Sequence, residues 1–360
     1  MKQYTIAVLG SHSALDVCRG AKDLGFKTLV IVQKGRDKTY AKYYKSENGL
    51  GCVDAVIELD KFSDILTEKV QKELLKRNAI FIPHRSFEVY INDYDAIEKK
   101  FKVPIFGNRF LLKCEERGVK PNQYDLLDKA KIRYPKQFKD PKNIDRLVIV
   151  KVLEKERGFE RAFFLVNDYR EYKQYTEHNL KEGLFTQEQL NSAIIEEFIL
   201  GVQVNFNFFY DSINDRLELI GTDTRRQTSL DGFLKLSAGH QTEVGKFITV
   251  KYEEAGHIAV TVLESLLEDA FAIGERFVEA TKKLDVPVIG PFGLQTMIIP
   301  GPPKKEIIVF DVSPRMPGSP GIFVTPYSGY LFGQNISMGK RVAMEIKLAL
   351  EKGELDKVLT

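Results

Sequence analysis

The sequence contains no tryptophan and, among 360 residues, only five histidines and three cysteines. Cys18, Cys52 and Cys114 lie far apart, and no CxxC or Cys/His spacing suits a zinc site or a disulfide framework. No apolar run approaches the roughly 20 residues that cross a bilayer, and the first residues lack the apolar stretch and cleavage site of a signal peptide. We therefore expect a protein of the reducing cytoplasm without a membrane partner.

Neither sign of charge dominates the composition. The 53 Lys and Arg residues nearly balance the 50 Asp and Glu residues, and the formal net charge is +3, so nothing here predicts a nucleic acid partner. Hydrophobic residues make up 43% and charged residues 29%, which is typical of a globular protein with an ample core. At ~150 residues per domain, we expect two or three packed units.

Residues 1–110 alternate short β-branched runs with amphipathic helical patterns. The strand-like runs are YTIAVLG, TLVIV, VIEL and AIFIP, and the helical segments between them include ALDVCRGAKDLG and FSDILTEKVQKELLKRN. Strands that alternate with helices predict a parallel sheet with right-handed crossovers. We expect an α/β, Rossmann-like first domain, with VPIFG as a further buried strand.

Beyond residue 110 the pattern changes to α+β. Residues 111–200 pair strand-like runs with turns and helices, which predicts a small lid, and residues 201–360 form the remaining domain. This last part is expected to contain a hairpin from VQVNFNFFY and RLELIGTDTR, a helix from His257 to Leu284, and a second hairpin from PFGLQTMII and EIIVFDVSPR.

The C-terminal hairpin carries the strongest chemical signal. Gln295 and Asp311 each lie inside an apolar strand, and Arg315 follows Asp311 by four residues. A polar side chain in such a strand is costly unless it binds something. Magnesium takes oxygen ligands, often carboxylates together with substrate phosphates, and an arginine fork holds phosphate. The alternative is that Asp311 caps the following turn and Gln295 lies on a solvated face.

Two upstream segments are candidates for contact with a nucleotide. Lys151 ends the β-branched run LVIVKVL, where it could neutralise phosphates as a compact point charge. By default such a lysine extends to solvent. The segment AIIEEFILG contains the acidic pair Glu196 and Glu197, which by itself more commonly marks an exposed strand end.

Segments along nearly the whole chain resemble, in the same order, the motifs of the archaeal FAICAR synthetases. These segments are IAVLGSHSAL, KGRD, IFIPHRSF, IFGNR, IIEEFILG, ELIGTDTRRQTSLDG, IGPFGLQ and SMGKRVAMEIKLAL. That family comprises formate-dependent ligases that formylate the amine of AICAR ribotide in purine (IMP) biosynthesis. The resemblance implies an ATP-grasp fold behind a Rossmann-like (pre-ATP-grasp) domain, with ATP and Mg²⁺ or Mn²⁺ as cofactors. It also implies ribotide and carboxylate substrates and a homo-oligomer.

The resemblance assigns roles to individual residues. Gln295 and Asp311 would hold the metal, and Arg315 would act in catalysis by stabilising developing charge. The nucleotide would contact Lys151, Glu196, Glu197, Phe198, Ile199 and Gln227.

Three residues would bind the ribotide, namely His12, Ser86 and His257. The turn that contains His12 suits this role, because it leads from the first strand to a helix N-terminus, where free N–H groups attract phosphate. The alternative is a plain N-cap by Ser11 or Ser13.

Departures from the family lie around both substrates. The glycine-rich lid loop is replaced by EKERGFERAFF, in which Gly158 remains and in which Arg157 and Arg161 are hypothetical phosphate ligands. The other replacements are Gln227 for a glutamate, His257 for an asparagine and Arg85 for a glycine. This pattern suggests a paralogue with altered substrate preference or weakened catalysis.

Two alternative functions follow from the same sequence. A degenerate ATP-grasp fold that binds nucleotide or ribotide for a regulatory purpose fits the lost glycine loop. A nicotinamide oxidoreductase is disfavoured, because GSHS lacks the GxGxxG fingerprint and no acidic residue clearly closes the second strand.

Overall fold

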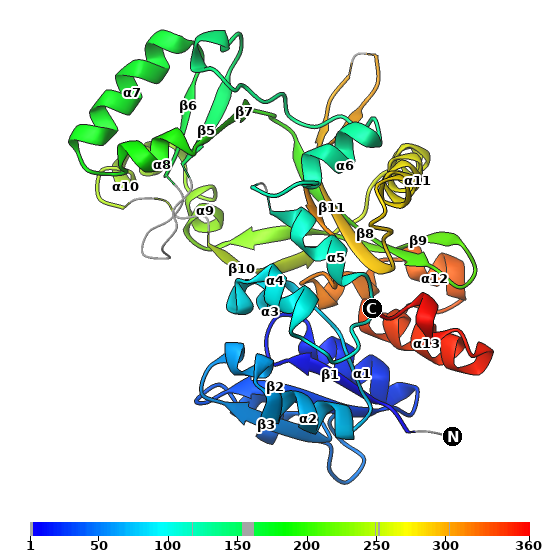
Figure 1. Cartoon of the computed structure of the whole chain (residues 1–360). Coiled ribbons are helices and arrows are strands. Elements are labelled where there is room, and N and C mark those ends of the chain that lie inside the picture. Colours follow the sequence, from blue (N-terminus) through cyan, green and yellow to red (C-terminus); the bar gives the residue numbers. More distant parts are fainter. Residues whose placement is uncertain (1–2, 117, 153–161, 249, 251–252, 302) are drawn as a thin grey trace.

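The computed structural model describes residues 3–116, 118–152, 162–248, 250, 253–301 and 303–360. Within these residues the chain forms three sheets of four, five and three strands, each with helices packed against it (Figure 1). None of the helices in these ranges has the length and hydrophobicity needed to span a bilayer.

The first sheet is parallel throughout, with the strand order β3-β2-β1-β4. Its elements are β1 (Thr5–Leu9), α1 (Ala14–Asp23), β2 (Lys27–Gln33), β3 (Ala55–Leu59), α2 (Glu68–Lys76) and β4 (Ala79–Phe81). Helices cover the sheet, so β1 is buried along its whole length. The predicted parallel sheet is confirmed.

The prediction of a regular strand at VPIFG is wrong. Its residues make only single bridges, from Ile105 to Phe81 and from Phe106 to Leu359. The segment is wedged between β4 and the end of the chain, and Gly107, at φ 98°, turns the backbone before a regular strand can form.

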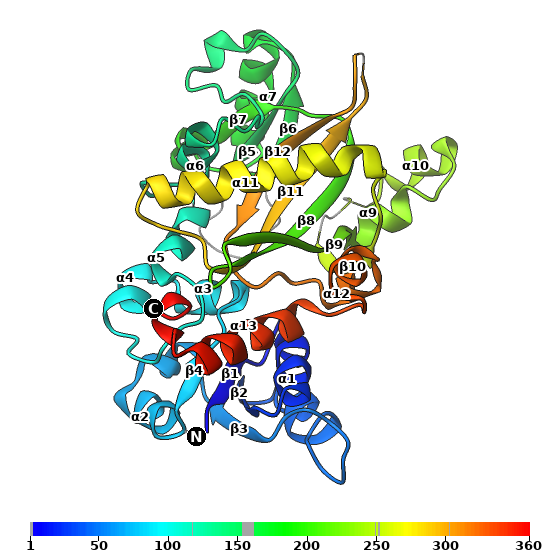
Figure 2. The same cartoon turned by 90° about the vertical axis from the view of Figure 1, so that its right-hand side faces the viewer.

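The second sheet is antiparallel, with the order β10-β9-β8-β11-β12. Its strands are β8 (Val202–Asp211), β9 (Arg216–Gln227), β10 (Glu254–Ala259), β11 (Gly290–Ile299) and β12 (Glu306–Ser313). Phe206, Phe208 and Leu294 pack in one core with residues of the long helix α11 (Leu267–Lys283), which crosses the sheet in Figure 2. Because side chains alternate along a strand, the residues between them face the opposite side.

The prediction of a helix from His257 to Leu284 is wrong about where the helix begins. His257 lies in β10, which pairs with β9 at the edge of the sheet, and the helix begins ten residues later at Leu267. Gly256 has φ 144°, which no helix accommodates, so the backbone stays extended here.

The third sheet is small and antiparallel, with the order β6-β5-β7. It consists of β5 (Val148–Val152), β6 (Ala162–Val166) and β7 (Ile194–Glu197), with α7 (Tyr169–Lys181) and α8 (Gln187–Asn191) packed beside it. It has a core of its own that includes Val150, Phe164 and Ile195. This unit is α+β, and its assignment as a lid stays a prediction.

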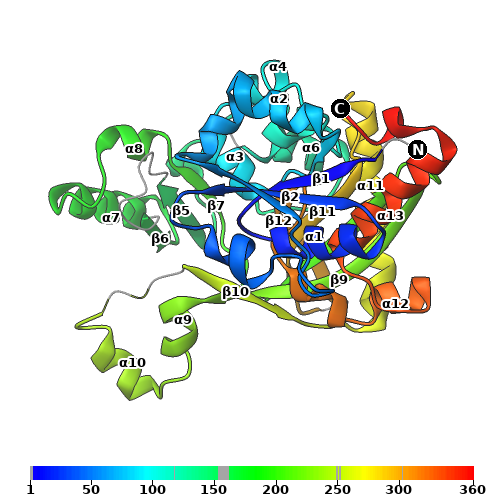
Figure 3. The same ribbon diagram turned by 90° about the horizontal axis from the view of Figure 1, so that it is seen from below.

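The remaining helices connect and cover these sheets. They are α3 (Arg85–Ile91), α4 (Tyr94–Lys99), α5 (Arg109–Leu112), α6 (Gln123–Lys129), α9 (Thr228–Phe233), α10 (Ala238–Val244), α12 (Tyr327–Phe332) and α13 (Met338–Lys352). Helices α9 and α10 project from the end of β9 (Figure 3). Helix α13 returns to the first sheet and packs on α1, where a Cβ on Gly339 would lie 2.3 Å from the Asp16 carbonyl oxygen. The predicted domain boundaries near residues 110 and 200 stay predictions.

Arg341 on α13 ties this helix to the second sheet. Its guanidinium donates to Asp211 (2.9 Å), Glu218 (2.5 Å) and Glu345 (3.0 Å), and all four side chains are at most 3% exposed. Arg341 is therefore the buried cation that compensates these three carboxylates, and the exposed Arg216 adds a second contact to Asp211 and Glu218.

We predict that Arg341→Met lowers the free energy of unfolding by about 3–5 kcal/mol in urea titrations, because it leaves these buried carboxylates without their buried counter-charge. Arg216→Met is the matched control, since Arg216 contacts the same Glu218 with a side chain that is 48% exposed. Its effect should stay within about 1 kcal/mol. Equal losses in the two variants would contradict this account.

Candidate active site

A cavity of about 380 Å³ lies where the three sheets meet. Its lining includes His12 and Arg85 from the first unit, Lys151 from β5, and Asn205, Asn207, Asp223, Arg225, Glu254, His257, Gln295, Asp311 and Arg315 from the second sheet and its extension. The fold therefore brings together the predicted site residues His12, Lys151, His257, Gln295, Asp311 and Arg315.

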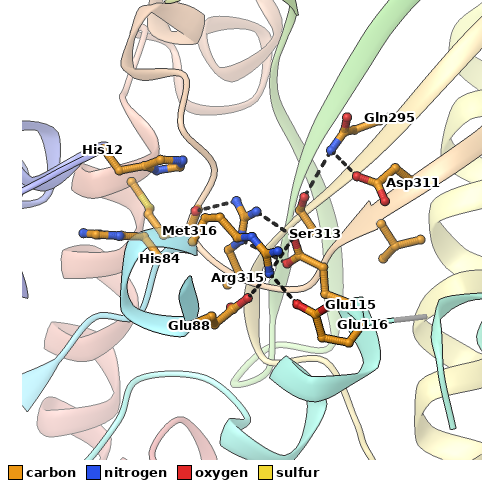
Figure 4. A network of polar contacts seen from close by, with 12 residues as sticks. His12, His84, Glu88, Glu115, Glu116, Gln295, Asp311, Ser313, Arg315 and Met316 are labelled. Carbon is orange, nitrogen blue, oxygen red and sulfur yellow. Dashed lines mark hydrogen bonds and ion pairs between the residues drawn. The ribbon is translucent and has the colours of Figure 1, made fainter. Parts of the chain in front are cut away.

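Gln295 and Asp311 face each other across the β11–β12 pair. They are register partners, and Gln295 Nε2 donates to Asp311 Oδ2 at 2.7 Å (Figure 4). Gln295 Oε1 is buried and has no hydrogen-bond partner among the described residues. On the neighbouring strand β8, Asn205 lies opposite Gln295. Its Oδ1 is likewise buried and has no hydrogen-bond partner among the described residues.

These oxygen atoms fit a hard divalent cation, which takes carboxylate and amide oxygens together with phosphate and water. The described residues contain no cluster of three or more His, Cys, Asp or Glu side chains suited to a metal. A cation here would thus depend on Asp311 together with the amide oxygens and the phosphates of a bound nucleotide.

A buried polar network spans β8, β9 and β10. Asp223 accepts hydrogen bonds from Asn205 Nδ2 (3.0 Å) and Asn207 Nδ2 (2.6 Å), and it pairs with His257 Nδ1. Burial by itself lowers the pKa of His257, but the hydrogen bonds to Asp223 and Glu254 outweigh it and raise this pKa to about 9. His257 is therefore a cation at neutral pH.

Asn205 and Asn207 are not among the predicted site residues, although the sequence holds a signal for them. In the run Asn205-Phe206-Asn207-Phe208 the amides alternate with phenylalanines. Period-two alternation puts both amides on the face opposite the α11 core, in an otherwise apolar strand.

His12 lies at the opposite side of the cavity, stacked on His84 with ring centroids 5.3 Å apart (Figure 4). Burial, with a smaller effect from nearby cations such as Arg315, lowers the pKa of His12 to about 2 and that of His84 to about 4. Both rings are neutral at neutral pH. Ser86 does not line the cavity, and its hydroxyl donates to Ser11 Oγ at 3.0 Å.

Arg315 is held in place by Glu115, which it contacts through Nε (3.2 Å) and Nη2 (2.9 Å) (Figure 4). Arg85 donates to Glu88 (2.9 Å) and Glu116 (3.1 Å). Burial and the neighbouring Glu115 raise the pKa of Glu88 above its usual range, against the opposing charges of the two arginines. Arg85 thus binds carboxylates of its own chain.

The predicted nucleotide residues lie mainly at the junction of the small sheet and the second sheet. Lys151 forms an ion pair with Glu196 across β5 and β7. Glu197 accepts from the Lys136 N–H (3.2 Å) and from Arg146 (3.3 Å). Glu196 and Glu197 are absent from the cavity lining, as are Phe198, Ile199 and Gln227.

The backbone of this junction is partly engaged within the chain. The N–H of Phe198 donates to the Leu147 carbonyl oxygen at 3.0 Å, and the N–H of Gln227, at the end of β9, donates to Asp231 at 3.1 Å. The assignment of these residues to a nucleotide stays a prediction. Arg157, Gly158 and Arg161 lie outside the described residues.

Comparison with known proteins identifies the family. Residues 6–138 match a family described as a protein of unknown function (DUF1246), and residues 171–360 match a domain of unknown function (DUF1297). The 5-formaminoimidazole-4-carboxamide-1-(beta)-D-ribofuranosyl 5'-monophosphate synthetase of Methanopyrus kandleri is 37% identical over 362 residues, which cover 100% of this chain and 96% of the relative. The synthetase of the same name from Methanothermobacter thermautotrophicus is 38% identical over 360 residues, which cover 99% of this chain and 94% of the relative.

The chain belongs to this synthetase family, the FAICAR synthetases. The IMP biosynthesis protein PurP from Thermococcus kodakaraensis has a similar structure, with a TM-score of 0.73 at 28% identity over 99% of this chain and 100% of that one. An N5-carboxyaminoimidazole ribonucleotide synthetase, solved as an ADP complex, gives a TM-score of 0.55 at 11% identity over 89% and 72%. The latter shows the fold alone, which is ATP-grasp, as predicted.

Gly318 keeps room for the His12 ring. A Cβ at this position would lie 2.5 Å from both Cε1 and Nε2 of His12. We predict that Gly318→Ala displaces the ring and weakens ribotide binding by about 10- to 100-fold, since misplacement by about 1 Å carries a penalty of that order. Isothermal titration with AICAR ribotide measures this change in affinity. Gly321→Ala, where a Cβ meets nothing within 4 Å, is the control and should bind normally. Equal affinities in the two variants would exclude a role for His12.

His257 should make stability depend on pH. Its folded pKa of about 9 exceeds the ordinary 6.5, so the stabilisation is complete below pH 6.5 and is lost as pH rises through 9. We predict that the difference in unfolding free energy between wild type and His257→Asn, measured with urea, shrinks from pH 6 to pH 10. A difference that is constant over this interval would show that His257 does not titrate there.

Proposed function

We propose that this chain is an ATP- and Mg²⁺-dependent ligase that formylates the amine of AICAR ribotide to give FAICAR. The proposal is supported above all by the facing pair Gln295 and Asp311 inside a cavity shared by the three sheets. Full-length identity of 37–38% to two synthetases of that name supports the substrates. ATP is the nucleotide that the ATP-grasp family uses.

The proposed reaction has two steps. A formate oxygen attacks the γ-phosphorus of ATP, the bond to the β–γ bridging oxygen breaks, and ADP leaves. The ribotide amine then attacks the carbon of formyl phosphate, loses a proton and expels phosphate. A divalent cation held by Asp311 and Gln295 would neutralise charge on the phosphates. Mn²⁺ satisfies the same oxygen ligands.

The protein's own contribution in this scheme is positioning and fixed charge. Arg315, whose guanidinium is oriented by Glu115, lies in the cavity as a donor for the transferring phosphoryl group. His12 and His257 contact the ribotide from opposite sides, one ring neutral and one charged. The buried setting limits water, which would hydrolyse formyl phosphate.

A second candidate function is nucleotide or ribotide binding without turnover, as a regulatory paralogue. It is favoured by internal ion pairs of the cations that line the cavity, since Lys151 pairs with Glu196, Arg315 with Glu115 and Arg85 with Glu88. Each pair must open or share its charge before phosphate binds. Self-association and cytoplasmic location stay predictions.

Release of ADP in the presence of ATP, Mg²⁺, formate and AICAR ribotide tests the proposal. We predict turnover by the wild type and a loss of about 100- to 1,000-fold in kcat for Asp311→Asn, the size expected when one preorganised charge contact is removed. Asp269→Asn is the control, because Asp269 is half exposed and pairs only with exposed Lys304 among the described residues. Tight ribotide binding without any ADP release would favour the second candidate. Full activity of Asp311→Asn would exclude the metal assignment.

A further inference from the structure

Glu254 presents its carboxylate to the cations on one side of the cavity. Its Oε1 lies 2.9 Å from His257 Nε2, and its Oε2 lies 3.4 Å from Arg225 Nε. All three residues line the cavity, together with Arg315. A carboxylate of the protein therefore occupies the place where these cations meet.

A β-bulge gives Glu254 this orientation. Glu254 and His257 are three residues apart, so in a regular strand their side chains would point to opposite faces. The pairing of β10 with β9 shifts register between Glu254 and Gly256, and Gly256 takes φ 144° in open space. The extra residue turns both side chains to the same face, as bulges beside functional sites commonly do.

The His257 side chain has more contacts that hold it in place than the Glu254 carboxylate has. His257 is 13% exposed and is fixed from behind by Asp223, which is itself buried and receives two asparagine amides. Glu254 is 43% exposed, and among the described residues its carboxylate contacts only His257 and Arg225. His257 is therefore anchored to the sheet by Asp223, whereas the part-exposed Glu254 carboxylate has no such second anchor among the described residues.

The surrounding charges converge on this point. The hydrogen bond from His257, against the effect of burial and together with the charges of Arg225 and Arg315, holds the pKa of Glu254 below its usual range. Besides burial and His84, the same three cations lower the pKa of His12 across the cavity. Without Glu254, Arg225 would have no carboxylate partner among the described residues, and His257 would keep Asp223 alone, which is costly in a part-buried setting unless another anion enters.

We propose that His257 and Arg225, with Arg315 nearby, form an anion subsite that Glu254 fills in the free chain and leaves when a substrate oxyanion enters. Glu254 is thus a specificity-determining residue, because an anionic group can take the place of its carboxylate beside the cations, whereas a neutral group cannot. The inference rests on the proposed function for its choice of substrate. The shared chemistry is a phosphate or carboxylate oxyanion, supplied either by the ribotide or by the acyl donor.

Inorganic phosphate is the first probe, in isothermal titration without ATP. Glu254→Gln should lower the apparent Kd about tenfold relative to wild type, which is the change expected if the internal carboxylate fills the subsite about 90% of the time. Glu243→Gln removes the same charge from exposed α10 and should leave the Kd unchanged. Adding Arg225→Gln to Glu254→Gln should remove the gain. Thermal unfolding confirms that each variant is folded.

An unchanged Kd in folded Glu254→Gln, or a gain that survives the loss of Arg225, would overturn the proposal. Titrations with AICAR ribotide, its riboside and formate then separate the two sources of the anion. Tighter binding of the ribotide but not of the riboside assigns the subsite to the ribotide phosphate, and tighter binding of formate alone assigns it to the acyl donor. A gain for none of them would overturn the role in substrate selection. These titrations need no turnover, so they can succeed or fail independently of ADP release.

Discussion

The pairing of β11 with β12 is the constraint on which the site depends. It sets Gln295 opposite Asp311 and continues directly into Arg315, so the two oxygen ligands and the charged guanidinium have one rigid frame. On the other side of β11, strand β8 adds Asn205 in register with Gln295. A one-residue slip of either pairing would turn these polar side chains into the α11 core.

Charge compensation within the chain is the second general feature of the cavity. Arg315, Arg85, Lys151 and His257 each contact at least one carboxylate of the same protein. These contacts stabilise cations that would otherwise be partly buried alone, and they preorganise the side chains. They also set a requirement for any anionic ligand, which must replace or share the internal carboxylates.

Much of the fold could be predicted from local patterns. Alternating strands and helices in the first part specify a parallel sheet, and the apolar hairpin around Gln295 and Asp311 specifies the facing pair. The predicted helix extends back to His257, whereas edge pairing with β9 keeps His257 in a strand. Glu115 had no sequence signal, since it meets Arg315 across 200 positions. The orientation of Glu254 could not be predicted, because it depends on a β-bulge. Register shifts of that kind are set by the pairing of strands and not by the local sequence pattern.

The central claim is that Gln295 and Asp311 bind a divalent cation together with a nucleotide. Electron paramagnetic resonance of Mn²⁺ in the presence of ATP tests it most directly, because the free ion and the bound ion give different spectra. The account predicts stoichiometric Mn²⁺ binding by the wild type and its loss in a folded Asp311→Asn, Gln295→Leu double variant. Retention of bound Mn²⁺ by that variant would contradict it.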